Sequence, residues 1–212
     1  MPAPLLPTLP SDQLIFAVIA RAAAALGQPA YVVGGYVRDR ALGRPSKDID
    51  VVTVGDGIRL ARAVAKALPG KATVSVFQSF GTAQVTYDGG EVEFVGARKE
   101  SYRGESRKPD VEPGTLAEDL ARRDFTINAL ALSLNESDFG AVVDHYDGLK
   151  DLASKTIRTP LDPDVTFSDD PLRMLRAVRF ATQLGFDIEP DTFDALGRNK
   201  DRLAIISQER IT

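Results

Sequence analysis

The stretch Val32-Val33-Gly34-Gly35-Tyr36-Val37-Arg38-Asp39 decides the fold of this chain, together with Lys47-Asp48-Ile49-Asp50-Val51-Val52 shortly after it. The first segment predicts a strand over 30–33 that breaks into two glycines and continues as a helical turn. At such a turn backbone N–H groups face outward and can meet a phosphate. Arg38, one turn further, can fork onto phosphate oxygens. The alternative is an ordinary glycine turn beside a surface arginine.

The second segment predicts a strand with carboxylates on one face. Its alternation places Asp48 and Asp50 on the same side, while Ile49 and Val51 enter the core. Two carboxylates roughly 7 Å apart along a strand can share a Mg²⁺ ion, which prefers oxygen ligands. The alternative is the solvated polar face of an amphipathic edge strand.

A third carboxylate is expected from a strand over 91–95, in which Glu91 and Glu93 share a face. This strand follows a hairpin turn at 88–90, and the segment 74–87 before it is predicted as one strand with a bend or bulge at Gly81. If the 91–95 strand lies beside the Asp48 strand, one of its two glutamates joins the pair. Glycines, a cation and clustered carboxylates together indicate metal-assisted phosphoryl transfer.

A short helix is predicted to begin with a capping box at Thr115. It is followed by two adjacent arginines, the second of which is Arg123, and by the polar residues Asp124 and Asn128. An apolar run that predicts a strand comes next. Asn128 at the edge of a core needs hydrogen-bond partners, so a structural role and a ligand contact remain equally open.

A helix predicted from a cap at Ser168 to Gly185 carries the largest group of arginines. Its buried stripe is expected at positions 175, 178, 181 and 184. Arg173, Arg176 and Arg179, spaced by three, begin beside Asp170 and are either a solvated face or a binding surface. An acid and an arginine one turn apart present acceptors and donors in fixed geometry, as reading the edge of a base requires.

Composition limits the other possibilities. The 212 residues are 43% hydrophobic and 26% charged, as in globular proteins. No Cys is present and His145 is the single His, so disulfides and Cys- or His-based zinc sites are excluded. The longest apolar stretch, 14–26, is too short to span a bilayer, and no signal peptide is recognisable, so we expect a cytoplasmic protein without membrane partners. The net charge is −4, whereas proteins that bind nucleic acid usually carry a surplus of basic residues. Any binding of nucleic acid must therefore use a local basic surface or be supplied from elsewhere.

The ordered set of motifs closely resembles the class II tRNA nucleotidyltransferase and bacterial poly(A) polymerase family, which includes the CCA-adding enzymes. The resemblance covers nearly the whole chain and rests on Gly34-Gly35-Tyr36-Val37-Arg38-Asp39, Asp48-Ile49-Asp50, residues 122–129 and residues 169–180. It implies an α+β fold: a polymerase-β-type nucleotidyltransferase head (1–165) with a mixed β-sheet backed by helices, followed by part of an all-helical neck (166–212).

The resemblance also implies roles for individual residues. Asp48 and Asp50 would hold Mg²⁺, and Glu93, preferred to Glu91 on the alignment alone, would be the third catalytic carboxylate. Asp170 and Arg173 would form the amino-acid template that pairs with the base, although the family usually has Glu-Asp where this chain has Asp169-Asp170. The remaining nucleotide-binding positions would be Gly34, Gly35, Arg38, Arg123, Asp124, Asn128, Arg176 and Arg179.

The implied reaction is template-independent nucleotidyl transfer from CTP or ATP to the 3′ end of tRNA, with release of pyrophosphate. The alternatives are a poly(A) polymerase, an enzyme that adds only CC or only A, and a nucleotide-binding fragment without activity. The last arises because Glu209-Arg210-Ile211 resembles the opening of the family's next motif, and the family's main tRNA-binding parts are expected beyond it.

Overall fold

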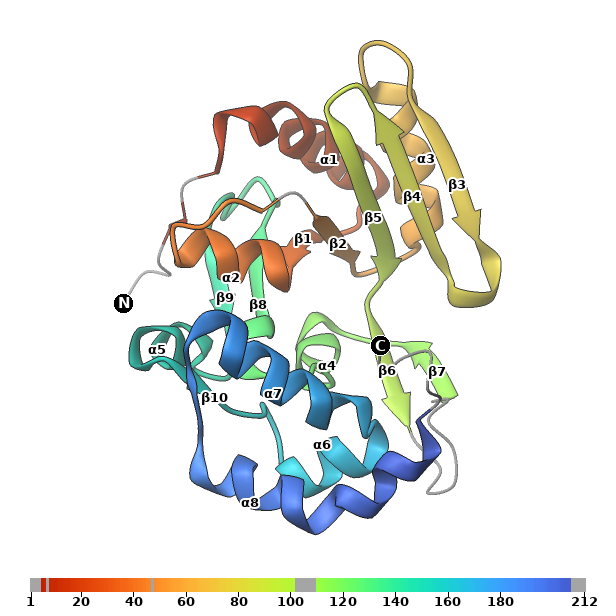
Figure 1. Ribbon diagram of the computed structural model, residues 1–212. Helices are drawn as coiled ribbons and strands as arrows, with labels where there is room; N and C mark the ends of the chain where they lie inside the picture. Colours follow the sequence, from red (N-terminus) through yellow and green to blue (C-terminus); the bar gives the residue numbers. More distant parts are fainter. Residues whose placement is uncertain (1–4, 7, 47, 102–109, 207–212) are drawn as a thin grey trace.

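The computed structural model describes residues 5–6, 8–46, 48–101 and 110–206 and has two parts, a sheet-based head and a helical region below it (Figure 1). The seven strands of the main sheet are, in spatial order, β3 (Thr73–Phe77), β4 (Thr82–Tyr87), β5 (Gly90–Gly96), β2 (Ile49–Thr53), β1 (Ala30–Val33), β8 (Leu130–Ser133) and β9 (Val142–Asp144). The helices of this part are α1 (Gln13–Leu26), α2 (Gly35–Ala41), α3 (Gly57–Ala67), α4 (Leu116–Ala121) and α5 (Gly148–Ser154).

Strand β2 lies inside the sheet, antiparallel to β1 and parallel to β5. The other neighbouring strands in this sheet are antiparallel, so the predicted mixed sheet is confirmed. Because β2 has a partner on each side, the edge-strand interpretation of its acidic residues is wrong.

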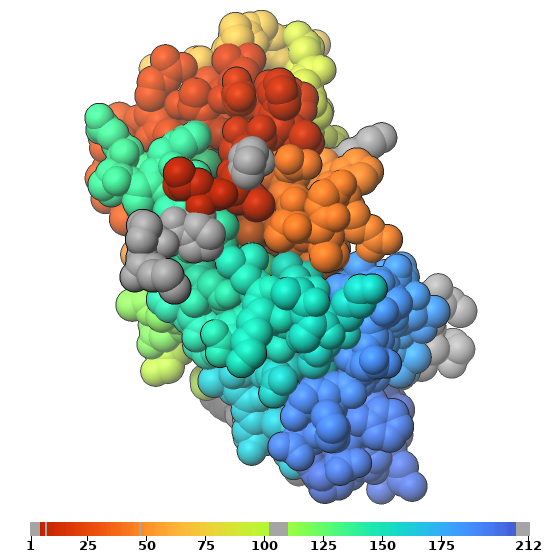
Figure 2. All heavy atoms as spheres, turned by 90° about the vertical axis from the view of Figure 1, so that its left-hand side faces the viewer, coloured from red at the N-terminus to blue at the C-terminus, as the bar shows by residue number. Residues whose placement is uncertain are grey.

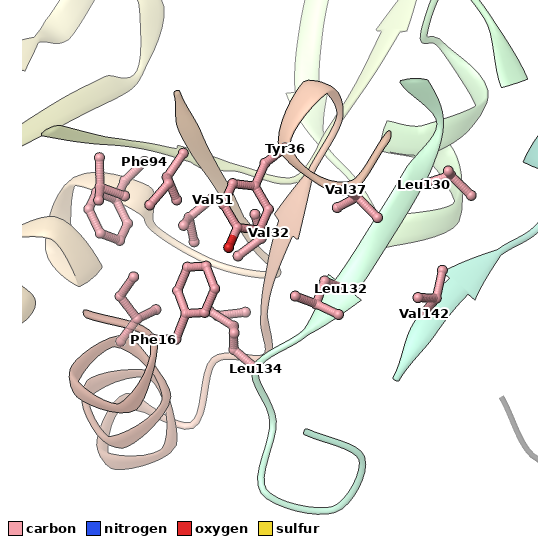
Figure 3. Packing of buried hydrophobic residues seen from close by; sticks show 14 of the residues in the cluster. Phe16, Val32, Tyr36, Val37, Val51, Phe94, Leu130, Leu132, Leu134 and Val142 are labelled. Carbon is pink, nitrogen blue, oxygen red and sulfur yellow. The ribbon is translucent and has the colours of Figure 1, made fainter. Parts of the chain in front are cut away.

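The main core lies between the sheet and the helices α1 and α3, which cover one of its faces (Figure 1). Phe16 of α1 meets the buried ring of Tyr36 edge-on, with 5.5 Å between ring centroids. Val32, Val51 and other strand residues complete this layer (Figure 3). On the opposite face a smaller apolar cluster that includes Val52 and Leu120 covers only part of the sheet. The alternation of β5 therefore leaves Glu91 and Glu93 exposed on that face.

The segment predicted as one strand over 74–87 is two strands. A 3₁₀ turn over Gln78–Phe80 separates β3 from β4, and Gly81 adopts φ 64°, in the left-handed region that favours glycine. The chain therefore reverses there rather than bending. The two halves pair antiparallel, with Ser75 opposite Gln84, which widens the sheet by one strand.

The helical part contains α6 (Pro163–Asp169), α7 (Leu172–Leu184) and α8 (Pro190–Asn199), with two-stranded pairs β10 (Thr156–Ile157)/β11 (Asp187–Ile188) and β6 (Arg98–Ser101)/β7 (Asp110–Pro113) beside it. Figure 2 shows α7 and α8 of this part from the side, in blue, below the orange surface around α2. The expected boundary between head and neck, at 165/166, falls inside α6. None of the helices in the described ranges is long and apolar enough to cross a membrane.

Two expectations for α7 need correction: the position of its cap is wrong, and its buried stripe is right only in part, since Ala181 and Leu184 pack against the core as expected. Ser168 belongs to the end of α6, and α7 begins after Pro171, where Asp170 accepts the backbone N–H of Leu172 at 3.2 Å. The buried stripe of α7 consists of Met174, Ala177 and Phe180, whereas position 178 is 54% exposed. Relative to the orientation expected from the sequence, α7 is rotated about its axis. The face that carries Phe180 turns toward the head, where the ring of Phe180 packs edge-on against Phe125.

The expected opening of a further motif at 209–211 lies outside the described residues.

Candidate active site

Three carboxylates gather where β2 and β5 run side by side. The parallel register places Asp50 directly opposite Glu93, while Glu91 lies outside this pairing. Asp48, just before β2, is exposed like Asp50. Both aspartates and Glu93 line a cleft of ≈ 680 Å³, which Asp12 and Glu91 also border. The sheet therefore supplies the neighbouring strand that the third carboxylate requires.

The charges in this cleft influence one another. Although both side chains reach solvent, partial desolvation inside the cleft raises the pKa of Asp50, which Arg123 lowers and the charge of Asp48 raises further. Partial desolvation also raises the pKa of Glu93, with a second contribution from Asp50 and an opposing one from Arg98. Two neighbouring carboxyl groups with raised pKa values are harder to ionise. A cation placed between them stabilises their ionised forms.

Glu91 has a different environment from Glu93. Its carboxylate accepts hydrogen bonds from the side-chain amide of Gln84 at 3.0 Å and from the hydroxyl of Thr86 at 3.4 Å. Both donors lie on β4, on the side away from β2. Of the two glutamates left open by the alternation of β5, Glu93 is the one that neighbours the aspartates.

The donor set fits a hard cation such as Mg²⁺ because all its candidate ligands are carboxylate oxygens. Across the described ranges no three acidic or histidine side chains form a group that could hold a metal ion by itself. This agrees with the usual Mg²⁺ site, in which one or two carboxylates act together with substrate phosphates and waters. Asp48 and Asp50 are the side chains available for that role.

The glycine pair joins β1 to α2. Gly34 has φ 70° and ψ −128°, a conformation that disfavours any side chain, and a Cβ built on it would lie 3.2 Å from Nη1 of Arg123. Gly35 opens α2, and a Cβ there would lie 3.6 Å from Nη2 of Arg38. Gly34 therefore lets Arg123 approach the backbone closely, whereas a Cβ at Gly35 would meet Arg38 at an ordinary van der Waals distance.

Arg38 connects α2 to the residues after α4. Its guanidinium forms a fork with Asp39, at 2.9 and 3.1 Å, and donates to Oδ1 of Asn128 at 2.7 Å. Asn128 in turn donates to Asp124 at 3.0 Å. Asn128 is thus satisfied structurally, and it also lies between two residues predicted to bind nucleotide.

Asp124 continues this chain of contacts to the helical part. Its second carboxylate oxygen accepts a hydrogen bond from Nε of Arg176 at 2.7 Å. A series of hydrogen bonds therefore runs from the head to α7, through Arg38, Asn128, Asp124 and Arg176 in that order. Arg179, one turn further along α7, is exposed and lies over the ring of Phe180.

Arg123 lies between the two groups. It donates to Asp119 at 3.0 Å, lowers the pKa of Asp50 and approaches Gly34. Asp119 is completely buried and also binds Arg122 at 3.0 Å. Sequence reasoning missed Asp119, although its spacing of three and four residues from the two arginines on a predicted helix was the available signal.

Arg173 has different hydrogen-bond partners from Arg176. It donates to the carbonyl oxygen of Arg122 at 2.7 Å and to that of Thr166 at 3.4 Å. Its backbone N–H also donates to the carbonyl oxygen of Asp170 at 3.0 Å. The first turn of α7 is therefore attached to the head through Arg173, and Asp170 and Arg173 are in contact through their backbones.

Comparison with known proteins connects these features to a family. The family described as "Poly A polymerase head domain" matches residues 30–158, and the one described as "Probable RNA and SrmB- binding site of polymerase A" matches residues 185–212. The first match contains the glycine pair, all three clustered carboxylates and Arg123, Asp124 and Asn128.

Among curated proteins, an A-adding tRNA nucleotidyltransferase of Aquifex aeolicus is 46% identical over 163 residues, which are 77% of this chain and 19% of that protein. A CCA-adding enzyme of Lactobacillus johnsonii is 41% identical over 187 residues, 87% of this chain and 44% of that protein. The chain thus spans less than half the length of these relatives. A solved tRNA nucleotidyltransferase, complexed with a primer tRNA and an incoming ATP analog, has a TM-score of 0.78 and 38% identity, over 91% of this chain and 53% of that one.

Proposed function

Because the chain belongs to the poly(A) polymerase head-domain family, we propose that it carries the catalytic part of a nucleotidyltransferase that extends the 3′ end of tRNA. The substrates would be CTP and ATP. The 3′-hydroxyl oxygen of the tRNA would attack the α-phosphorus, a new phosphodiester bond would form, and pyrophosphate would leave with the electron pair of the broken bond. The observation that carries this proposal is the register of Asp50 with Glu93, which gathers carboxylates in one cleft, with Arg123 close enough to lower the pKa of Asp50.

Asp48 and Asp50 would hold Mg²⁺, and Glu93 would support that site as the third carboxylate. Bound Mg²⁺ supplies Lewis-acid stabilisation of the phosphoryl oxygens and makes the attacking hydroxyl easier to deprotonate. The raised pKa values of Asp50 and Glu93 support this role, because desolvation and, to a smaller extent, neighbouring carboxylates disfavour their charged forms, which a bound cation favours.

The nucleotide would lie against the other predicted residues. Arg38, Arg176 and Arg179 would bind the triphosphate, and Gly34 and Gly35 would allow its oxygens to approach the backbone. Arg123, Asp124 and Asn128 would contact the nucleotide beside them. The pairing of Arg38 with Asp39 and of Arg176 with Asp124 implies that phosphate would exchange for or share these carboxylate contacts.

Asp170 and Arg173 would read the base. The contact of Arg173 with the carbonyl of Arg122 supports a fixed template, since the arginine is held to the head and not left free. We propose that residues 1–165 act as the head and 166–212 as part of the neck in this arrangement, with CTP or ATP bound between them.

A second candidate is addition of A alone, which the 46% identity to an A-adding enzyme favours over a general poly(A) activity. The two activities share the head residues. Sequencing the 3′ ends made from tRNA lacking CCA and from tRNA ending in CC distinguishes them, because an A-adding enzyme extends only the second substrate.

The test combines binding and turnover by the 212-residue chain. Calorimetry with CTP or ATP and Mg²⁺ measures binding, and incorporation of labelled nucleotide into tRNA measures chemistry. We expect Asp50→Asn and Glu93→Gln to lower incorporation by at least about a hundredfold, while chelation of Mg²⁺ abolishes it.

Glu91→Gln is the matched control, because Glu91 lines the same cleft but lies outside the register with β2. Incorporation that survives Asp50→Asn refutes the proposed site. Binding of CTP and ATP without incorporation by the wild-type chain identifies it as a nucleotide-binding unit that requires the parts present in its longer relatives.

A further inference from the structure

Phe180 of α7 is the point at which three predicted nucleotide-binding arginines meet. The guanidinium carbons of Arg38, Arg176 and Arg179 each lie 5.1 Å from the centroid of its ring. Arg38 comes from the head, and the other two come from α7 itself. Phe180 is only 7% exposed, so this ring is held inside the junction of the two parts.

The ring is fixed independently of the arginines. Phe125, which is fully buried, packs against it with 6.0 Å between centroids and an interplanar angle of 83°. An edge-to-face pair of this kind determines which way an aromatic face points. The arginines therefore meet a ring whose orientation the head core has already set.

Three like charges around one ring require compensation. Asp39 pairs with Arg38 and Asp124 with Arg176, so the cluster contains one more cation than carboxylates. Within the described ranges the guanidinium of Arg179 has no hydrogen bond or ion pair, and it lies over the ring of Phe180. The negative face of an aromatic ring attracts cations and can hold such a group in place.

We propose that Phe180 is a positioning residue that assembles these three arginines into one triphosphate-binding cluster. The inference rests on the proposed function, because it assigns the arginines to the triphosphate. The ring acts through the guanidinium groups that lie over it. Its removal should therefore weaken every ligand that contains the polyphosphate, whatever its base.

The test measures binding of CTP, ATP and inorganic pyrophosphate, each with Mg²⁺, by calorimetry. Phe180→Leu keeps an apolar side chain but removes the ring face. We expect dissociation constants about tenfold higher for all three ligands, equivalent to about 1.4 kcal/mol. Phe180→Tyr, which retains the face, should stay within about twofold of wild type.

Phe186→Leu is the matched control, because Phe186 is 8% exposed in the same core and no arginine lies over its ring in the described structure. It should leave all three dissociation constants within about twofold of the wild-type values. A loss with Phe180→Leu that Phe180→Tyr reverses supports the proposal, since general loosening of the core would affect both leucine variants.

Equal affinities of wild type and Phe180→Leu, or a loss confined to one nucleotide, overturn the inference while leaving the proposed function intact. A wild-type chain that binds none of the three ligands overturns the proposed function, and the inference falls with it. Where the assay includes turnover, Phe180→Leu should raise KM for both nucleotides with kcat within about twofold, whereas an effect on kcat alone contradicts a positioning role.

Discussion

Replacing Asp119 by Asn tests whether the buried carboxylate of α4 fixes the arginines beside the cleft. Asp119 is completely buried and accepts hydrogen bonds from Arg122 and Arg123, both at 3.0 Å. The substitution keeps the size of the side chain and one acceptor oxygen. It removes the negative charge that both guanidinium groups share.

The expected loss of stability follows from the burial of each partner. Breaking a buried ion pair by removing one member costs about 3–5 kcal/mol when the other is left without solvent. Here the side chains of Arg122 and Arg123 are 19% and 17% exposed, and the Asn oxygen still accepts one bond. We therefore expect the free energy of unfolding to fall by about 2–3 kcal/mol, or the melting temperature by about 4–12 °C.

The loss should also depend on pH. Burial acts to raise the pKa of Asp119, but Arg123 and Arg122 outweigh it and hold the pKa below its usual range. A carboxyl whose pKa is lower in the folded than in the unfolded state stabilises the fold above the unfolded value, about 3.9. That contribution disappears as the pH falls through the folded-state pKa. The difference between wild type and variant should be full at pH 7 and shrink below about pH 4.

The assay is denaturant unfolding of both proteins between pH 7 and pH 3, followed by circular dichroism. Asp164→Asn is the matched control, because Asp164 forms an ion pair with Arg198 at 2.8 Å on the exposed surface. Its effect should be much smaller, since water screens exposed pairs. A variant at Asp119 that matches wild type at pH 7, or a difference that stays constant down to pH 3, refutes the reasoning.

Three further outcomes are expected. Gly34→Ala should weaken binding of CTP by at least about tenfold, because positive φ strains a side chain that also approaches Arg123, whereas Gly43→Ala, with φ 67° and open space, should leave binding unchanged. Asn128→Ala should raise the dissociation constants of CTP and ATP about tenfold in calorimetry, because the link between Arg38 and Asp124 is lost. Arg173→Lys should reduce the preference for CTP and ATP over UTP and GTP in incorporation assays more than it reduces pyrophosphate binding; unchanged selectivity would exclude the template role.

Local patterns were sufficient to predict most of the elements. The alternation around Asp50 correctly indicated a strand with buried Ile49 and Val51, and the Thr115 capping box correctly placed α4. Both signals depend on residues that lie only a few positions apart in the sequence. The reversal at Gly81 was harder, because a glycine between two apolar runs fits a bulge as well as a turn until the pairing of β3 with β4 is known.

The rotation of α7 shows what local periodicity leaves undetermined. Positions 175 and 178 fit an apolar stripe as well as Met174 and Ala177 do, and the choice depends on which side meets the head. Contact between Phe180 and Phe125, 55 positions apart in the sequence, makes that choice in the folded chain. The same contact brings Arg38 beside the α7 arginines. The packing that sequence periodicity did not predict is therefore the packing that assembles the proposed triphosphate site. If α7 were rotated about its axis so that positions 175 and 178 faced the head, its arginines would be separated from the head.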